Sequence, residues 1–304
     1  MIRIPPALQP GDTIGITCPA GYMEYQQAAD CIATLQRWGF EVWVGRTLGS
    51  ASKNYFSGTD EERRDELQAM LDAPEIKAIL CGRGGYGMSR IIDSLDFTRF
   101  RKNPKWIIGF SDITVLHTHL LQQHKIASIH GPMAAAFAGG GSKSKYVQSL
   151  RHVLTGQPIR YKCKPHRYNK TGEVEGILVG GNLALLAHVC GTPDAPDTKN
   201  RILFIEDVGE YLYNIDRMML QLKRAGKLRQ LAGLIVGGFT DVKDTTRPYG
   251  KTAYQIIQEH IAGYTYPVCF GFPVSHAREN YALPCGTHCT LSVTETGVYL
   301  TQPS

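Results

Sequence analysis

A regular alternation of short apolar runs with longer amphipathic segments in the first 135 residues most constrains the fold of this 304-residue chain. The apolar runs predict strands, and the amphipathic segments between them predict helices. Strands are expected at residues 12–17, 40–44, 76–81, 106–108 and 126–130, and helices at 24–38 and 59–71. Because strands that alternate with helices form a mostly parallel sheet with helices on both faces, the expected class is α/β.

The pattern of the remaining residues is different. A loose stretch at residues 136–145 (AFAGGGSKSK) indicates the start of a linker, so domains are expected at 1–140 and 141–304. Strands are expected at residues 159–163, 172–179, 202–205, 234–237, 268–271 and 289–300, and helices at 182–189, 215–225 and 253–261. This mixture predicts a C-terminal domain of mixed α/β character.

Composition argues against several classes of protein. Hydrophobic residues make up 43% and charged residues 20% of the chain, as in ordinary globular proteins. No apolar run approaches the ~20 residues that span a bilayer, and the N-terminus lacks the apolar segment of a secretion signal. The net charge of +6 is modest, and the lysines and arginines are scattered along the sequence. Both features disfavour nucleic-acid binding. We therefore expect a cytoplasmic protein without membrane or nucleic-acid partners.

The eight cysteines do not form a recognisable metal motif. Cys285, His288 and Cys289 are close in sequence, but no second cluster completes a tetrahedral site. Small buried thiols in a reducing cytosol explain the cysteines better than a metal site does, and no metal is expected.

Residues 106–116 (WIIGFSDITVL) are typical of a strand, a sharp turn and a helix, with Ser111 at the turn. A serine placed there points toward a ligand beyond the sheet edge, and the helix N-terminus behind it favours negative charge. This arrangement suits a nucleophile whose reaction develops an oxyanion. The alternative is a helix cap, since serine is a preferred capping residue and the second glycine of the usual Gly-x-Ser-x-Gly turn is absent.

Three loops that follow predicted strands carry suggestive residues, at 83–87 (RGGYG), 109–112 (GFSD) and 130–133 (HGPM). Ligands bind beyond the carboxyl ends of parallel strands, where these loops would meet. The glycine-rich loop is either a simple tight turn or a source of backbone N–H groups for an oxyanion. It does not fit the dinucleotide-binding fingerprint or the P-loop.

Glu206 ends an apolar strand, and His276 lies in a loop after another strand. Glu206 is either a surface acid near Asp207 and Glu210 or the residue that orients a catalytic histidine. A single loop histidine is usually a surface residue, and His130 is a rival candidate for the base.

The motifs RGGYG, GFSD and HGPM are followed in order by GGNL at 180–183, LFIEDVGE at 203–210 and a loop at 271–284. Through this ordered set, nearly the whole chain resembles the LD-carboxypeptidases, also called muramoyl-tetrapeptide carboxypeptidases. The resemblance implies cytoplasmic serine peptidases with an N-terminal nucleophile domain, a C-terminal domain that supplies the acid and the histidine, and usually a homodimer.

Carried over by motif, Ser111 resembles the nucleophile, Glu206 the acid and His276 the general base. The backbone amides of Asp112 and of the Gly84–Gly85 turn resemble the oxyanion hole. Arg83 is a candidate for binding the terminal carboxylate by position only, and no metal or organic cofactor is needed. The chain departs from the family where Ser275 replaces the common glycine before the histidine, which would alter the backbone of that loop.

The resemblance implies release of the terminal D-alanine from murein tetrapeptides, a step of cell-wall peptide recycling. It leaves open the diamino acid, meso-diaminopimelate or lysine, and whether the peptide carries sugars. One alternative is a hydrolase of aminoacyl-nucleotide amides similar to the microcin C immunity proteins, for which Tyr211 and Tyr213 could form an aromatic platform. The other alternative is a non-catalytic ligand-binding module.

Overall fold

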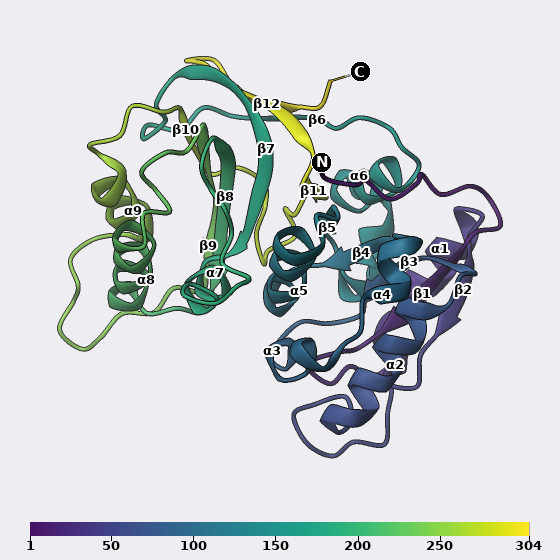
Figure 1. Cartoon of the computed structure of the whole chain (residues 1–304). Helices are drawn as coiled ribbons and strands as arrows, with labels where there is room; N and C mark the ends of the chain where they lie inside the picture. The colour runs from purple at the N-terminus through teal and green to yellow at the C-terminus, as the bar shows by residue number, and fades with distance from the viewer. Residues whose placement is uncertain (304) are drawn as a thin grey trace. The chain divides into compact units, whose positions relative to one another are not determined.

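A computed structural model describes residues 1–303 of the chain (Figure 1). By contacts between residues, the chain divides into two compact units. Unit 1 contains Met1–Gln157 and Tyr281–Pro284, and unit 2 contains Pro158–Asn280 and the residues from Cys285 onward.

Unit 1 is built on a six-stranded sheet with the order β11-β5-β4-β3-β1-β2. Its strands are β1 (Thr13–Thr17), β2 (Glu41–Val44), β3 (Ile76–Cys81), β4 (Trp106–Gly109), β5 (Ser128–His130) and β11 (Leu283–Cys285). Its helices are α1 (Tyr25–Arg37), α2 (Asp60–Asp72), α3 (Met88–Ile91), α4 (Thr98–Lys102), α5 (Thr114–His119) and α6 (Lys145–Leu154). Strands β1 to β5 pair in parallel, which confirms the predicted α/β architecture.

The strand order places the glycine-rich loop at the centre of the sheet edge. From β1 the chain first moves outward to β2 and then crosses back to β3, so the order reverses between β1 and β3. Such a reversal opens a crevice at the carboxyl ends of the two strands, where ligands bind in open α/β sheets. The loops after β1 and β3 meet there, because the Gly21 N–H donates to the Gly84 carbonyl at 2.9 Å.

The boundary between the units differs from the predicted linker. Phe137 is buried, and its ring centroid lies 5.9 Å from that of Trp38. Helix α6 begins directly after the glycine-rich stretch, with Ser144 as N-cap, and its Arg151 guanidinium lies 5.9 Å from the Trp38 ring centroid. Residues 136–145 thus pack on unit 1, and the contacts divide the chain after Gln157. The extent of the independently folding domains stays a prediction.

Strand β4 leads through a 3-10 turn into α5, as the sequence predicts. The helical segment continues from α5 into a π-helical turn at Leu120–His124, and Lys125 ends it in the left-handed conformation. His117 of α5 is buried, and its Nε2 lies 2.8 Å from the Gly109 carbonyl at the end of β4. This hydrogen bond fixes the helix to the strand end that precedes Ser111.

Unit 2 contains a seven-stranded sheet with the order β10-β9-β8-β7-β12-β13-β6. Its strands are β6 (Arg160–Cys163), β7 (Gly172–Asn182), β8 (Arg201–Val208), β9 (Gly233–Thr240), β10 (Val268–Phe270), β12 (His288–Val293) and β13 (Val298–Thr301). Its helices are α7 (Leu183–His188), α8 (Leu212–Arg224) and α9 (Ala253–Ile261). Strands β7 to β10 are parallel, whereas β12 and β13 are antiparallel to their neighbours, which confirms the predicted mixed character.

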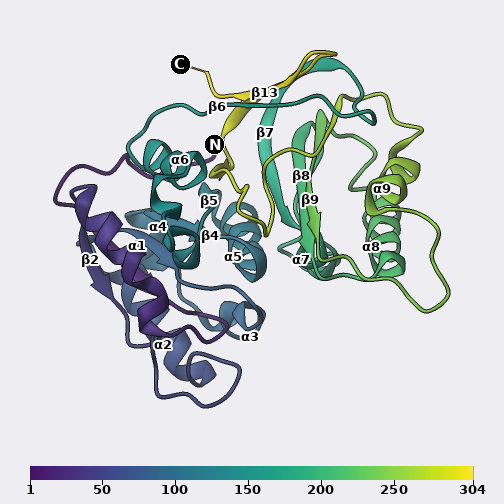
Figure 2. The same ribbon diagram turned by 180° about the vertical axis from the view of Figure 1, so that it is seen from behind.

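The three helices of unit 2 cover one face of its sheet. The crossovers from β7 to β8, β9 and β10 all move in the same direction, and right-handed crossovers then place every helix on the same side. Both views show α8 and α9 side by side, and β7 strongly curved (Figures 1 and 2). The single terminal strand predicted at 289–300 is wrong, because a turn at Thr294 and Gly297 divides it into the β12–β13 hairpin.

None of the helices within residues 1–303 combines the length and the apolar character needed to cross a bilayer.

The buried imidazole of His117 gives unit 1 a specific pH dependence. Burial lowers the pKa of His117 from 6.5 to about 4. Between these values the unfolded chain binds the extra proton, so acid favours unfolding. From pH 7 to pH 5, the wild type is expected to lose about 2 kcal/mol more unfolding free energy than His117→Gln. Urea unfolding measures this difference through the fluorescence of unit 1, which holds Trp38, Trp43 and Trp106.

Glutamine retains a donor for the Gly109 carbonyl but does not titrate in this range, so it isolates the protonation effect. Equal losses in both proteins would show that His117 is not held neutral by burial.

Candidate active site

Ser111 adopts a backbone conformation that serines rarely occupy. Its φ is +62°, in the left-handed region, directly after β4. For a residue other than glycine, such a conformation costs on the order of 1–3 kcal/mol and persists only where the surroundings enforce it. Nucleophilic serines at strand-to-helix turns are held in this strained way, which exposes the hydroxyl above the sheet edge. Ser111 is partly exposed, whereas Asp112 and Ile113 after it are buried.

The glycine-rich loop approaches Ser111 so closely that residue 84 must lack a side chain. A Cβ atom on Gly84 would lie 2.9 Å from the Ser111 Cβ and 3.2 Å from the Ser111 Oγ. The backbone of the 83–87 loop therefore runs directly beside the serine hydroxyl. Gly85 follows with a φ of +96°, which turns the chain sharply at this point.

The carboxylate of Asp112 links the serine turn to the glycine-rich loop. Its Oδ2 accepts a hydrogen bond of 2.7 Å from the N–H of Met88, the first residue of α3. The third loop is attached on the other side, where the Gly131 N–H donates to the Gly109 carbonyl at 3.1 Å. The three loops that the sequence singles out thus meet at one edge of the unit 1 sheet.

Two further candidates of unit 1 have defined surroundings. Arg83 is exposed, and its Nη1 donates to the carbonyl of Tyr22 at 2.7 Å. His130 is fully buried at the end of β5, and its ring centroid lies 5.7 Å from that of Phe110. His130 therefore packs against Phe110, the residue before Ser111.

Unit 2 brings Glu206 and His276 together. His276 Nδ1 lies 2.6 Å from Glu206 Oε2, and the Glu206 side chain is fully buried while that of His276 is 15% exposed. A carboxylate that accepts a hydrogen bond from Nδ1 fixes the ring and its tautomer, and leaves Nε2 to exchange protons with a substrate or nucleophile. Glu206 is thus not a surface acid, although its sequence neighbours allowed that interpretation.

Asp207 has a different structural role from Glu206. Its carboxylate accepts hydrogen bonds from the Asn182 side chain at 2.8 Å and from the Ala184 N–H at 3.0 Å, at the start of α7. Burial raises the pKa of Asp207 to about 7. Successive side chains of a strand point to opposite faces, which separates the two neighbouring acids. The pairing of β8 with β9 also shifts register between Ile205 and Asp207, so Glu206 lies at an irregularity of the ladder.

Two consecutive glycines of β9, which the sequence reasoning did not single out, make room for the histidine loop. A Cβ on Gly237 would lie 2.2 Å from the Val274 carbonyl oxygen and 3.2 Å from the Glu206 Cβ. A Cβ on Gly238 would lie 2.5 Å from the Ser275 Cβ. A Gly-Gly pair at the end of an apolar run was the available signal, because glycine in a strand often marks a close backbone approach.

Ser275, the departure from the family pattern, is accommodated by local hydrogen bonds. Its Oγ donates to the Glu279 carbonyl and accepts from the Ala277 N–H, each at 3.0 Å. The hydroxyl therefore closes a short turn directly after His276. The φ of Ser275 is not positive, so this position does not require glycine in this chain.

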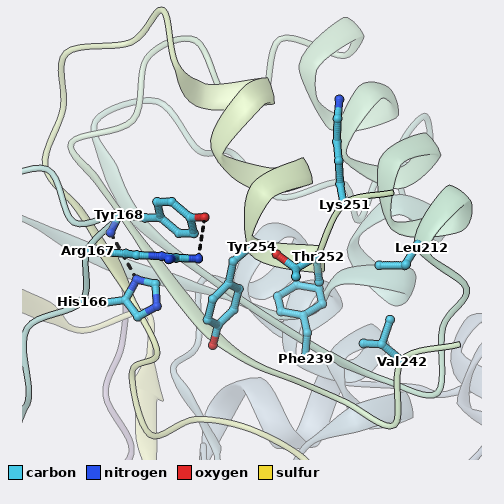
Figure 3. Close-up of a pocket in the computed structure, with 10 residues that line it drawn as sticks. His166, Arg167, Tyr168, Leu212, Phe239, Val242, Lys251, Thr252 and Tyr254 are labelled. Atoms are coloured by element: carbon cyan, nitrogen blue, oxygen red, sulfur yellow. Dashed lines mark hydrogen bonds between the residues drawn. The ribbon is translucent and has the colours of Figure 1, made fainter. Parts of the chain in front are cut away.

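An aromatic pocket of about 470 Å³ lies elsewhere in unit 2 (Figure 3). His166, Tyr168 and Tyr254 line it together with residues at the starts of α8 and α9. None of the predicted site residues is among its lining residues. The pocket is connected to the Glu206–His276 pair through Gly237, which lies beside Glu206. The hydroxyl of the pocket residue Tyr254 donates to the Gly237 carbonyl at 2.9 Å.

The cysteines are free thiols, and Cys285 and Cys289 are both buried. Within residues 1–303, no three histidine, cysteine, aspartate or glutamate side chains are grouped as metal ligands.

Comparisons with known proteins cover both units. A family model for the LD-carboxypeptidase N-terminal domain matches residues 14–131, and one for the LD-carboxypeptidase C-terminal domain matches residues 175–291. A probable murein peptide carboxypeptidase of Bacillus subtilis is 35% identical over 96% of this chain and 92% of its own length.

A crystal structure of muramoyltetrapeptide carboxypeptidase from Oxalobacter formigenes superposes with a TM-score of 0.86 at 30% identity, covering 96% of this chain and 100% of that one. The microcin C7 self-immunity protein of Escherichia coli is 26% identical over 96% of this chain and 94% of its own length. The matches to both domain models and to full-length relatives lead to one conclusion. This chain belongs to the LD-carboxypeptidase family of peptidases.

Proposed function

We propose that this protein is a serine-type LD-carboxypeptidase that releases the terminal D-alanine from murein tetrapeptides. The observation that carries the proposal is the buried pair of Glu206 and His276, 2.6 Å apart. The relatives named as murein peptide and muramoyltetrapeptide carboxypeptidases support the substrate class. The proposal includes a cytoplasmic homodimer and no cofactor, as the family resemblance implies.

In the proposed mechanism, Ser111 is the nucleophile and His276 is the general base. His276 takes the hydroxyl proton as Ser111 attacks the carbonyl carbon of the L-configured diamino-acid centre that precedes D-alanine. Glu206 holds the imidazole in position and stabilises the imidazolium that forms. His276 then gives the proton to the amine of the departing D-alanine. Water, activated by the same histidine, hydrolyses the acyl-enzyme and regenerates Ser111.

The oxyanion of this reaction is proposed to form against the backbone N–H groups of Asp112 and of the Gly84–Gly85 turn. The close approach of Gly84 to Ser111 supports this assignment, because an oxyanion donor must lie within a few ångströms of the attacked carbon. Removing one such donor typically costs about 2.7–4 kcal/mol of transition-state stabilisation.

Arg83 is proposed to bind the terminal carboxylate of the substrate. Arg83 is exposed, and its Nη1 donates to the Tyr22 carbonyl of the loop after β1. A guanidinium presents several donors in a planar fork that matches a carboxylate.

A second candidate function rests on an exposed aromatic pair at the start of α8. The rings of Tyr211 and Tyr213 stack with centroids 5.4 Å apart, and both residues are exposed. Lys243 and Arg217 lie over these rings, which adds positive charge to a flat surface. Such a surface suits a nucleotide, so hydrolysis of aminoacyl-nucleotide amides, the reaction expected of proteins similar to the microcin C immunity proteins, remains the alternative.

The proposal predicts which substrate is cleaved. L-Ala-γ-D-Glu-meso-diaminopimelate-D-Ala is expected to release D-alanine, measured by mass spectrometry, whereas the pentapeptide ending in D-Ala-D-Ala is not. The lysine-containing tetrapeptide, assayed in parallel, determines the diamino acid. If an aminoacyl sulfamoyl-adenylate is hydrolysed faster than either tetrapeptide, the alternative function takes precedence.

The proposed triad predicts non-additive losses. Ser111→Ala, Glu206→Ala and His276→Ala should each lower kcat for D-alanine release by about 10⁴-fold or more. The double variant of Ser111 and His276 should be about as slow as either single variant, because the residues act as a unit. Circular dichroism checks that each variant is folded. An inactive His130→Ala beside an active His276→Ala would transfer the role of base to His130.

Because Gly84 lies so close to Ser111, we expect the addition of one methyl group at residue 84 to lower the activity strongly. Gly84→Ala places a Cβ 2.9 Å from the Ser111 Cβ, so the loop or the serine must shift. Displacing reacting groups by about 1 Å can cost about 10²-fold in rate, and we expect a fall in kcat of this order. Gly263→Ala, where no atom lies within 4 Å of the added Cβ, is the matched control and should leave kcat unchanged.

A further inference from the structure

Arg63 on α2 is a fully buried arginine that the proposed chemistry does not use. We propose that Arg63 is a positioning residue, which holds the glycine-rich loop in place beside Ser111. The inference rests on the proposed function for its catalytic consequence, whereas the positioning itself is a property of unit 1 alone. Arg63 does not touch the reacting atoms in this account.

The Arg63 guanidinium binds the two loops that meet at the carboxyl ends of β1 and β3. Its Nη1 donates to the carbonyl of Pro19 at 2.6 Å and to the carbonyl of Gly87 at 3.2 Å. Pro19 follows β1, and Gly87 ends the glycine-rich loop after β3. One nitrogen of Arg63 therefore joins both sides of the crevice where the strand order reverses.

The other side of the guanidinium is fixed from α2 itself. Its Nη2 forms an ion pair with Asp60, whose carboxylate also accepts hydrogen bonds from Arg90 at 2.6 and 2.9 Å. The guanidinium carbon lies 4.8 Å from the centroid of the Phe56 ring. These contacts hold the planar group in one orientation and provide the opposite charge that a buried cation needs.

A second contact holds the same loop end from the opposite side. Arg63 binds the carbonyl of Gly87, and Asp112 accepts the N–H of the next residue, Met88. Because Asp112 directly follows Ser111, the peptide between Gly87 and Met88 is held between Arg63 and the serine turn. The loop end therefore cannot rotate without breaking one of these two hydrogen bonds.

The packing around Gly87 leaves no space for a side chain. Its φ is +147°, and a Cβ there would lie 2.8 Å from the Arg63 Nη1 and 3.0 Å from the Ala20 Cα. Three residues earlier, Gly84 runs beside the Ser111 side chain. A displacement at Gly87 is thus transmitted over a short, tightly packed segment to the N–H groups proposed to face the oxyanion.

Lysine cannot replace this arginine without loss. Two nitrogens of the Arg63 guanidinium bind two carbonyls and a carboxylate, whereas an ammonium group is a compact point charge. In Arg63→Lys the ion pair with Asp60 can persist while the carbonyl contacts weaken. Arg63→Met removes both and retains most of the apolar stem.

Lys105 provides a matched control in the same unit. It is also buried, and its Nζ donates to two backbone carbonyls, of Met70 at 2.9 Å and of Ala73 at 2.5 Å. Those carbonyls lie at the end of α2, not in the glycine-rich loop. Lys105→Met therefore reproduces the loss of a buried cation without disturbing the loop.

The experiment measures hydrogen exchange and kinetics on the full chain. In Arg63→Met, backbone amide exchange of residues 82–88 should accelerate at least about fivefold, with Arg63→Lys intermediate and Lys105→Met unchanged. For D-alanine release from the tetrapeptide, kcat of Arg63→Met should fall about 10²-fold while KM changes less than about threefold. If Arg63→Met does not fold, the same exchange and kinetic measurements on Arg63→Lys decide the question.

Two outcomes would overturn the inference. One is exchange of residues 82–88 at the wild-type rate in both Arg63 variants. The other is a fall of kcat in Lys105→Met that equals the fall in Arg63→Lys or Arg63→Met. This result would show that Arg63 only stabilises the fold. If instead the wild type releases no D-alanine, the carboxypeptidase proposal fails, while the exchange measurement still decides whether Arg63 positions the loop.

Discussion

The left-handed backbone at Ser111 is held by contacts from several parts of unit 1. A serine at φ +62° is strained, so neighbouring groups must hold it there. Gly84 allows the glycine-rich loop to approach the serine, Asp112 attaches that loop through Met88, and His117 fixes the preceding strand end. The sheet supplies the common edge, because parallel strands β3, β4 and β5 end side by side. Local strain and tertiary packing together thus expose one hydroxyl above a rigid sheet.

In unit 2 the feature that needs an explanation is the buried carboxylate of Glu206. An ionised acid taken out of water needs a partner, and Glu206 has His276 at 2.6 Å. The other carboxylate oxygen, Oε1, is also buried and has no hydrogen-bond partner within residues 1–303. The arrangement depends on Gly237 and Gly238, which admit the histidine loop against the sheet. A carboxylate held this firmly is suited to orienting an imidazole and stabilising its protonated form.

Elements with strong local signals were predictable from the sequence. Strand β3 has the predicted bounds, and α2, predicted at 59–71, begins after the capping box of Thr59 and Glu62. Predictions failed where tertiary contacts override local pattern. Helix α6 begins directly after a glycine-rich stretch that predicts the start of a linker, and β8 buries Glu206 and Asp207 beyond its apolar run. A charged residue interrupts the apolar pattern of a strand in the sequence. The partners that allow such a residue to be buried come from other parts of the fold.

The same limit applies to the candidate site. The motifs singled out Ser111, Glu206 and His276, and the resemblance assigned the acid to Glu206, but the residues alone did not separate Glu206 from a surface acid beside Asp207. That distinction comes from side-chain direction along β8 and from the different partners of the two acids. The role of Arg63 was also hidden, because a single arginine on an amphipathic helix is normally exposed. Its burial follows from the meeting of two loops far apart in the sequence.

The roles proposed for Ser111, Glu206 and His276 are best tested by covalent labelling of the full chain with a serine-directed fluorophosphonate, located by peptide mass spectrometry. We expect one adduct, on Ser111, formed rapidly in the wild type and at least about 10³-fold more slowly in Glu206→Ala and His276→Ala. An adduct on another residue would show that Ser111 is not the nucleophile, and labelling of Ser111 at the wild-type rate in His276→Ala would show that His276 is not its base.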